Sequence, residues 1–295
     1  MAALFIVSLC VLAVTKVTLQ GAFAKKNVVN DLDGTLFNGT IFLVVALIFS
    51  YKLFSLDAHL MLYGTVFGVV TVFFQLFYIR SFAYGDISIS VMTVNLAMIA
   101  PIIFSLIAYG EKLTVVRGIG IALSIFAIVI GTEKITRSVD PSQTENEKIR
   151  RRKRLIFSIA ASVINGFTMI FLKIFAKSEY GGKTQEFLFF GYVFAALLSG
   201  VLFLVIRARG KKLSFRPGKK MLLYAILAGV FLGLHQFVYM AALKKVDATV
   251  MYPCMNGGIM ILSGLSGLFL LKDKLAKRQI AALCIAAAAI VMMSL

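Results

Sequence analysis

The sequence contains little charge, and acidic residues are especially scarce. Only 15% of its 295 residues are charged, and 13 Asp and Glu stand against 31 Lys and Arg, which gives a formal net charge of +18. An ordinary soluble domain has roughly 25% charged residues. With 60% hydrophobic residues and a mean hydropathy of +0.93, the composition excludes a water-soluble domain and predicts an integral membrane protein.

Tryptophan, histidine and cysteine are also rare, which excludes several kinds of site. No Trp is present, so any aromatic belt at the membrane interface must use Tyr and Phe. His59 and His235 form no HxxxH or HExxH pattern, and no acidic residue lies deep in an apolar stretch, so we expect no enzyme, metal site or cofactor. Cys10, Cys254 and Cys284 lack disulfide or metal-ligand spacing, and we interpret all three as small buried hydrophobic residues.

Apolar segments of about 20 residues fill most of the chain, and each can cross the roughly 30 Å hydrocarbon core of a bilayer as a helix. They predict an all-α membrane protein with ten transmembrane helices, in other words a multi-pass protein, which we expect in the plasma (cytoplasmic) membrane. The segments lie at about residues 2–24, 35–54, 60–83, 87–109, 113–132, 155–176, 186–206, 221–243, 247–271 and 276–294.

The segments form two groups of five on either side of a charged linker. We divide the chain into a first five-helix repeat at residues 1–132, a linker at 133–154 and a second five-helix repeat at 155–295. The linker contains Pro141 and the basic run Arg150–Arg154, and its polarity predicts a solvated loop rather than a helix in lipid.

The two groups are related by an internal repeat. A shift of 161 residues aligns polar residues in the third and fourth segments with the same residue types in the eighth and ninth, which shared apolar composition alone does not explain. Because each repeat has an odd number of helices, the second crosses the membrane in the opposite sense, and such inverted repeats are typical of secondary transporters. The aligned identities include Tyr63/Tyr224, Gly68/Gly229, Gln75/Gln236, Tyr78/Tyr239, Asp86/Asp247 and Asn95/Asn256.

Two short motifs occupy equivalent positions in the repeats. Gly110–Leu113 closes the fourth segment with the sequence GEKL, and Leu271–Leu275 closes the ninth with LKDKL. With the two five-helix halves, they make the whole chain resemble the drug/metabolite transporter (DMT) superfamily, EamA-like branch, although Asp273 stands where that family usually has Glu. The resemblance implies a central cavity enclosed by the first, third, fourth, sixth, eighth and ninth helices, with the fifth and tenth as scaffold. It implies a small-metabolite transporter without naming the substrate.

Polar residues inside the segments are the candidates for the substrate site, because they are costly to expose to lipid. Lys16 lies about 10 Å from the nearer end of its segment, so it either faces the cavity or reaches the interface by extending its side chain. The Gln and Asn pairs can line the cavity or hydrogen-bond neighbouring helices, and His235 can bind substrate or simply pack. The candidate substrate-binding residues are Lys16, Gln75, Tyr78, Asn95, His235, Gln236, Tyr239 and Asn256.

The nature of the buried charge predicts the charge of the substrate. The four-helix relatives of the superfamily use a buried glutamate in the first helix for cations, whereas the deep charged residue of the first segment here is Lys16. A lysine without a buried carboxylate favours a neutral, zwitterionic or anionic metabolite, such as an amino acid. Near the start of the ninth segment, Pro253, Gly257 and Gly258 predict a weakened helix that could expose backbone carbonyl groups.

These observations predict a secondary transporter that works by alternating access; the alternative is a channel-like or non-transporting membrane protein. Most Lys and Arg residues outside the segments follow odd-numbered segments, so the positive-inside rule places those loops in the cytoplasm and both termini outside. The basic loops favour anionic lipid headgroups over nucleic acid as partners. We also consider a homodimer.

Overall fold

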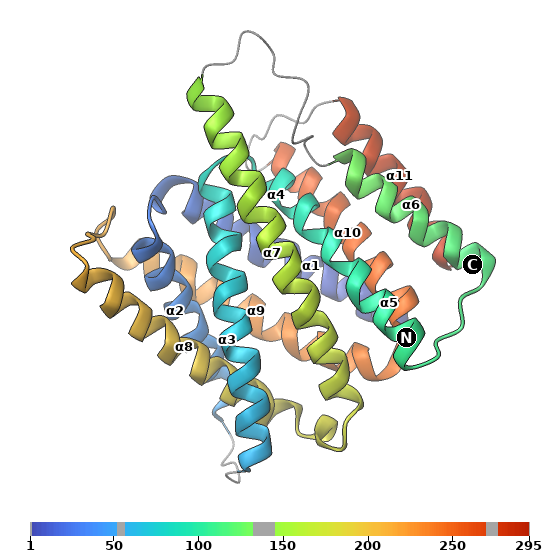
Figure 1. Ribbon diagram of the computed structural model, residues 1–295, viewed down its shortest axis with the longest axis horizontal. Coiled ribbons are helices and arrows are strands. Elements are labelled where there is room, and N and C mark those ends of the chain that lie inside the picture. The colour runs from blue at the N-terminus through green and yellow to red at the C-terminus, as the bar shows by residue number, and fades with distance from the viewer. Residues whose placement is uncertain (1, 52–56, 132–144, 270–276, 295) are drawn as a thin grey trace.

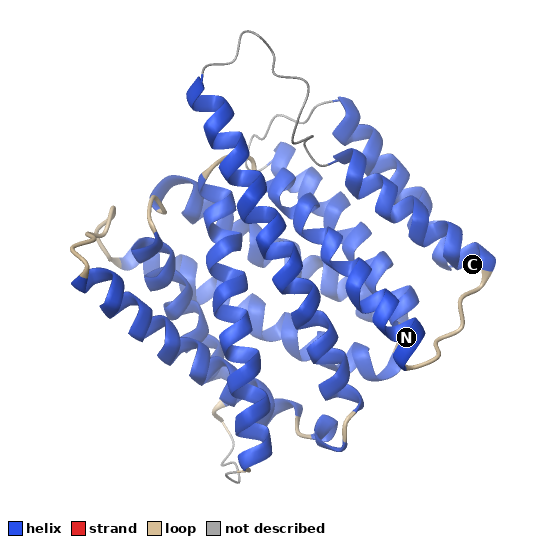
Figure 2. Cartoon of the chain, in the orientation of Figure 1, coloured by secondary structure: helices blue, strands red, loops and turns tan. Residues whose placement is uncertain are grey.

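The computed structural model describes residues 2–51, 57–131, 145–269 and 277–294, and over these residues the chain forms helices and no strand (Figure 2). Eight helices are long and apolar enough to cross a membrane, and residues 115–130 and 280–292 form two shorter apolar helices. These features confirm the predicted all-α membrane protein.

The helices follow the predicted segments closely. The first half contains α1 (Ala2–Asn27), α2 (Asp31–Phe49), α3 (Ala58–Ala83), α4 (Ile87–Val94), the short 3₁₀ helix η1 (Asn95–Met98), α5 (Ile99–Ala108) and α6 (Val115–Gly131). The second half contains α7 (Glu145–Lys177), the 3₁₀ helix η2 (Glu179–Gly182), α8 (Thr184–Ala208), α9 (Lys219–Lys245), α10 (Ala248–Phe269) and α11 (Lys277–Ser294).

The start of α2 is set by a capping box rather than by the apolar pattern. Asn30 accepts hydrogen bonds from the backbone N–H groups of Leu32 and Asp33, and the Asp33 carboxylate accepts one from the N–H of Asn30. This reciprocal cap satisfies N–H groups that a helix start leaves unpaired. It begins α2 four residues before the predicted segment, within polar sequence.

The fourth transmembrane segment is interrupted, whereas the ninth is a continuous helix. This differs from the prediction that Pro253 weakens the ninth helix. Residues Asn95–Met98 form η1 between α4 and α5, while α10 contains Pro253 in its interior. Pro101 explains the interruption, because it is the third residue of α5, in the first turn, where the missing N–H breaks no bond within that helix.

The basic part of the predicted linker is helical. α7 begins at Glu145, ten residues before the predicted segment, and Glu145 and Glu147 in its first turn favour a helix start through the helix dipole. Residues 150–154 therefore continue the transmembrane helix, which extends past its neighbours (Figure 1). Arg154 is 7% exposed and lies against Gly85 before α4. Pro141 lies outside the described residues.

The helix packing repeats between the two halves. α1 packs on α9 as α7 packs on α3, and α2 packs on α9 as α8 packs on α3. The pairs α2/α8 and α6/α11 each join equivalent helices of the two halves, and α6 and α11 lie together at one edge (Figure 1). Cys284 on α11 is exposed, so its predicted burial is wrong, whereas Cys10 and Cys254 are buried.

Two ends of the bundle are defined by their loops. The odd face carries residues 28–30, 84–86 and 209–218, which follow odd-numbered spans; there, Asn30 donates a hydrogen bond to the carbonyl oxygen of Lys212 at 3.1 Å. The even face carries residues 109–114, 178–183 and 246–247; there, the Lys183 ammonium lies 3.0 Å from the Asp57 carboxylate that caps α3. The cavity lies between these faces.

Candidate substrate cavity

A cavity of about 110 Å³ lies among α1, α3, the α4–η1 junction, α7, α9 and α10. A single water needs roughly 10–15 Å³ on this scale, so the space admits several waters or one small solute. The six enclosing spans are those that the resemblance implied, and α8 adds Tyr192. All eight predicted residues line this cavity: Lys16, Gln75, Tyr78, Asn95, His235, Gln236, Tyr239 and Asn256.

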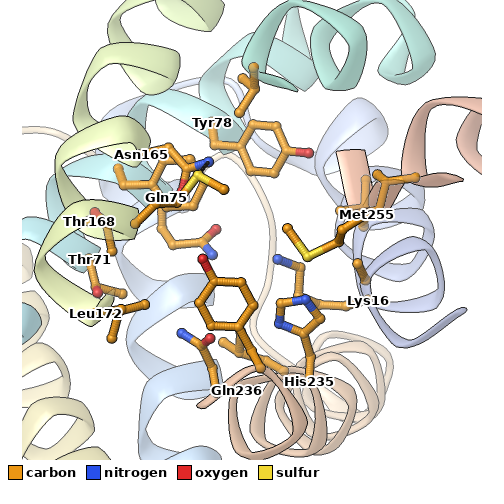
Figure 3. A pocket seen from close by; sticks show the side chains of 18 of the residues that line it. Lys16, Thr71, Gln75, Tyr78, Asn165, Thr168, Leu172, His235, Gln236 and Met255 are labelled. Atoms are coloured by element: carbon orange, nitrogen blue, oxygen red, sulfur yellow. Dashed lines mark hydrogen bonds between the residues drawn. The ribbon is translucent and has the colours of Figure 1, made fainter. Parts of the chain in front are cut away.

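Two basic side chains lie next to each other at one part of the cavity. Lys16 of α1 is 8% exposed, and its side chain lies beside that of His235 of α9 in the wall of the cavity (Figure 3). Among the described residues, no carboxylate lies within 4 Å of the Lys16 ammonium, and the His235 Nδ1 atom has no hydrogen-bond partner. Lys16 thus faces the cavity rather than the interface. In the described residues, this part of the cavity contains basic side chains and no carboxylate paired with them.

The two glutamines both line the cavity and bond to neighbouring helices. Gln20 of α1 donates to the Gln75 Oε1 atom at 3.4 Å, and the Gln236 Nε2 group donates to the Tyr192 hydroxyl at 3.0 Å. Thr71, one turn before Gln75 on α3, also faces the cavity, and its buried hydroxyl has no partner among the described residues. The helix-contact and cavity-lining interpretations therefore apply to the same side chains.

The two asparagines connect the repeats. The Asn95 Nδ2 group donates to the backbone carbonyl of Asn256 at 3.1 Å, and the Asn256 Nδ2 group donates to the Tyr252 carbonyl, one turn earlier in α10, at 2.8 Å. Both side chains are nearly fully buried. Asn95 and Asn256 are equivalent positions, and their contact is one of the places where the two halves meet beside the cavity.

Aromatic rings form much of the remaining wall. Phe74 and Tyr78 stack with ring centroids 5.3 Å apart on α3, and His235 and Tyr239 stack at 5.8 Å on α9. Tyr78 and Gln75 point into the same space as His235 and Gln236 from the opposite side (Figure 3). The cavity therefore combines a basic region, neutral hydrogen-bonding groups and aromatic faces. Asn165 and Thr168 of α7 also line it, and they were not predicted.

A buried ion pair that was not predicted lies near the cavity. The Lys173 ammonium lies 3.1 Å from the Glu111 carboxylate, and their side chains are only 1% and 8% exposed. Each residue lies near the end of an apolar segment, where a charge normally reaches water, so the apolar pattern does not indicate that either is buried. The only signal was the repeated motif that contains Glu111.

The GEKL motif places Glu111 by its backbone conformation. Gly110 follows the C-terminus of α5 with φ of 59°, a left-handed value that favours glycine. The Glu111 carboxylate also accepts a hydrogen bond from the N–H of Thr249 at 3.0 Å. Burial alone would raise the pKa of Glu111, but the backbone N–H groups of Ala248 and Thr249 and the Lys173 ammonium outweigh it and hold that pKa below its ordinary value.

Comparisons with known proteins agree with this architecture. A crystal structure of another protein, one of 28 matching solved chains, superposes with a TM-score of 0.70 at 13% identity, over 99% of this chain and 94% of that chain. At this identity the likeness shows a shared fold. No curated protein matches the chain. Residues 152–295, which contain α8 to α11 and nearly all of the membrane-crossing part of α7, match the model of the EamA-like transporter family. This match over residues 152–295 confirms the resemblance of the chain to the EamA-like branch of the drug/metabolite transporter superfamily.

Proposed function

We propose that this protein is a secondary transporter that moves a small polar metabolite, zwitterionic or anionic in its preferred form, across the plasma membrane by alternating access. The observation that carries this proposal is the pair Lys16 and His235 in the wall of the cavity, without a carboxylate beside it in the described residues. The family match supports transport, and the cavity chemistry supports the class of substrate.

The physical argument rests on charge balance. A buried ammonium without a counter-charge is unfavourable, so Lys16 requires water, proton loss or an anion. A substrate carboxylate or phosphate supplies the anion, with His235 as an additional hydrogen-bond donor. The amino group of a zwitterion can bind the amide oxygens of the cavity or the faces of Phe74 and Tyr78. The Lys16 ammonium repels a lipophilic cation and so disfavours its binding.

The mirrored packing of the halves supports alternating access. The largest contacts between unlike spans have counterparts: α1 packs on α9 as α7 packs on α3, and α2 packs on α9 as α8 packs on α3. A conformation open to one face therefore has a symmetry-related conformation open to the other. The cavity remains between the halves in both.

Counterflow in proteoliposomes tests the proposal with a panel of amino acids, organic acids, sugars and quaternary ammonium compounds. Wild-type protein should show saturable counterflow for an acidic or zwitterionic solute. Lys16→Gln should weaken the apparent affinity for the acidic solutes by roughly 10- to 100-fold, because a hydrogen bond to a charged group is worth about 1.5–3 kcal/mol.

Lys26→Gln is the matched control, since Lys26 lies exposed at the end of the same helix. It should transport like wild type. Preference of the wild type for quaternary ammonium compounds, or equal transport of acidic solutes by Lys16→Gln, would contradict the proposed substrate class. Unsaturable flux without counterflow would instead indicate a channel.

A further inference from the structure

The pair Glu111–Lys173 differs from the other ion pairs of the described residues. Both of its side chains are nearly inaccessible, at 8% and 1%, whereas Asp57 and Lys183, on the same face, are 20% and 46% exposed. Exposed pairs contribute little to stability, but breaking a buried pair by removing one partner leaves an uncompensated charge. Only the buried pair therefore constrains the positions of the segments that carry it.

One carboxylate holds three segments together. Glu111 follows α5 in the first half; one of its oxygens bonds Lys173 of α7, and the other accepts the N–H of Thr249 in the first turn of α10. A carboxylate at a helix N-terminus is also favoured by the helix dipole. One turn further along α10, the Tyr252 hydroxyl donates to the carbonyl oxygen of Met169 on α7 at 3.3 Å. Two successive layers of contacts thus join α7 to α10.

These contacts lie between the cavity and the even face. Met169 and Leu172 line the cavity, and Lys173 is the next residue of α7 toward the even face. On α10, Met255 and Asn256 line the cavity, while Thr249 and Tyr252 precede them toward the even-face end of the helix. A solute that enters from the even face between these helices has to separate the three segments.

We propose that Glu111, Lys173 and the N-terminus of α10 form an access latch that holds the even side of the substrate cavity closed. This inference rests on the proposed function, since it assigns the latch to the same cavity. When the latch opens, the ion pair breaks and water hydrates both charged groups. The desolvation cost of burying the two charges offsets much of their Coulomb attraction, so the closed state is only moderately favoured and the latch can open. Its residues are positioning residues: they control access and need not touch the solute.

The test measures access to the cavity without relying on transport. A reporter thiol is introduced as Thr71→Cys on the cavity wall, in a background in which Cys10, Cys254 and Cys284 are replaced by alanine. An impermeant thiol reagent is applied from each face in turn, in right-side-out and inside-out vesicles, and the labelling rate is recorded. Thermal unfolding in detergent checks that each variant is folded.

Breaking the latch should open one face only. Glu111→Gln and Lys173→Met should each raise labelling from the even face by about tenfold or more, as expected when a buried pair loses one partner. Labelling from the odd face should fall or stay the same. The charge-swapped double variant, Glu111→Lys with Lys173→Glu, should return even-face labelling part of the way to the wild-type rate.

The chain offers a matched control in the exposed pair of the same face. Asp57→Asn removes the charge opposite Lys183 but keeps a side chain that caps α3, and it should leave labelling unchanged. Unchanged even-face labelling in both Glu111→Gln and Lys173→Met, or an equal rise from both faces, would overturn the latch. A protein that shows the one-sided rise but no counterflow would retain the latch and lose the proposed function.

Discussion

At the scale of single residues, two buried lysines differ in their partners. Lys173 is neutralised inside the protein by Glu111, whereas Lys16 has no carboxylate within ion-pair distance among the described residues. The first charge is used to hold helices together, and the second remains available to a solute. This difference, rather than the number of basic residues, underlies the proposed substrate class.

The glutamines allow helix contact to be separated from substrate binding. Interhelical hydrogen bonds in membranes are worth about 0.6 kcal/mol on average, so Gln75→Leu or Gln236→Leu should change stability only slightly. If the side chains bind substrate, counterflow should nevertheless fall several-fold, while the folded yield in the membrane stays near that of wild type. Transport and thermal unfolding are measured on the same preparations. Unchanged counterflow in both variants would assign Gln75 and Gln236 to helix contact alone.

Depth within a segment decided which site residues could be predicted. Gln75, His235 and Asn256 lie well inside apolar segments, where a polar group needs an interior location, and they line the cavity. Glu111 and Lys173 lie at segment ends, where either burial or hydration satisfies a charge. Only the tertiary arrangement that brings Glu111, Lys173 and the start of α10 together decides between those outcomes, and a single sequence does not specify that arrangement.

At the scale of helices, the span number was predictable because hydrophobic length is a strong signal, but breaks and extensions were less so. Pro253 and Pro101 are both prolines in apolar segments, yet the 3₁₀ segment precedes Pro101. What distinguishes them is which turn of a helix each occupies, and this depends on where neighbouring helices support the chain. In the extension of α7, Arg154 likewise lies against Gly85, a tertiary contact that the sequence pattern does not specify.

Close packing of α3 on α8 gives a prediction at this scale. A Cβ at Gly68 would lie 2.6 Å from the carbonyl oxygen of Gly191 and 3.1 Å from the backbone N of Ala195. Gly68→Ala must therefore separate the two helices and should lower the stability by about 1–3 kcal/mol, measured by thermal unfolding in detergent. Gly200→Ala on α8 is the control: it meets no atom within 4 Å and should leave stability unchanged or slightly higher. Equal effects of the two substitutions would contradict this packing.

At the scale of the whole molecule, the two faces differ in charge. Arg207, Lys211 and Lys212 surround one hollow of about 230 Å³ on the odd face, beside Leu32. The even face carries fewer basic residues, and among them Lys183 is paired with Asp57. The positive-inside rule accordingly favours an odd face in the cytoplasm.

Cysteine accessibility in intact cells tests that orientation. In the cysteine-free background, Lys112→Cys on the even face should react with an impermeant thiol reagent, and Lys211→Cys on the odd face should react only after permeabilisation; both native side chains are exposed. The opposite pattern would place both termini in the cytoplasm. It would also identify the cytoplasm as the side toward which the latch opens.

The hydrogen bond between the two asparagines has a consequence for how the molecule chooses a state. Asn95 is the donor and Asn256 supplies the carbonyl, although the two positions are equivalent. If the repeats exchange conformations, the same kind of bond can form with donor and acceptor interchanged. The two amide side chains are identical, so their chemistry alone favours neither direction. Any preference for one side must come from residues that the repeat does not share, such as His235, whose counterpart is Phe74. In the proposed mechanism, such differences in sequence between the halves would set which conformation the protein adopts at rest.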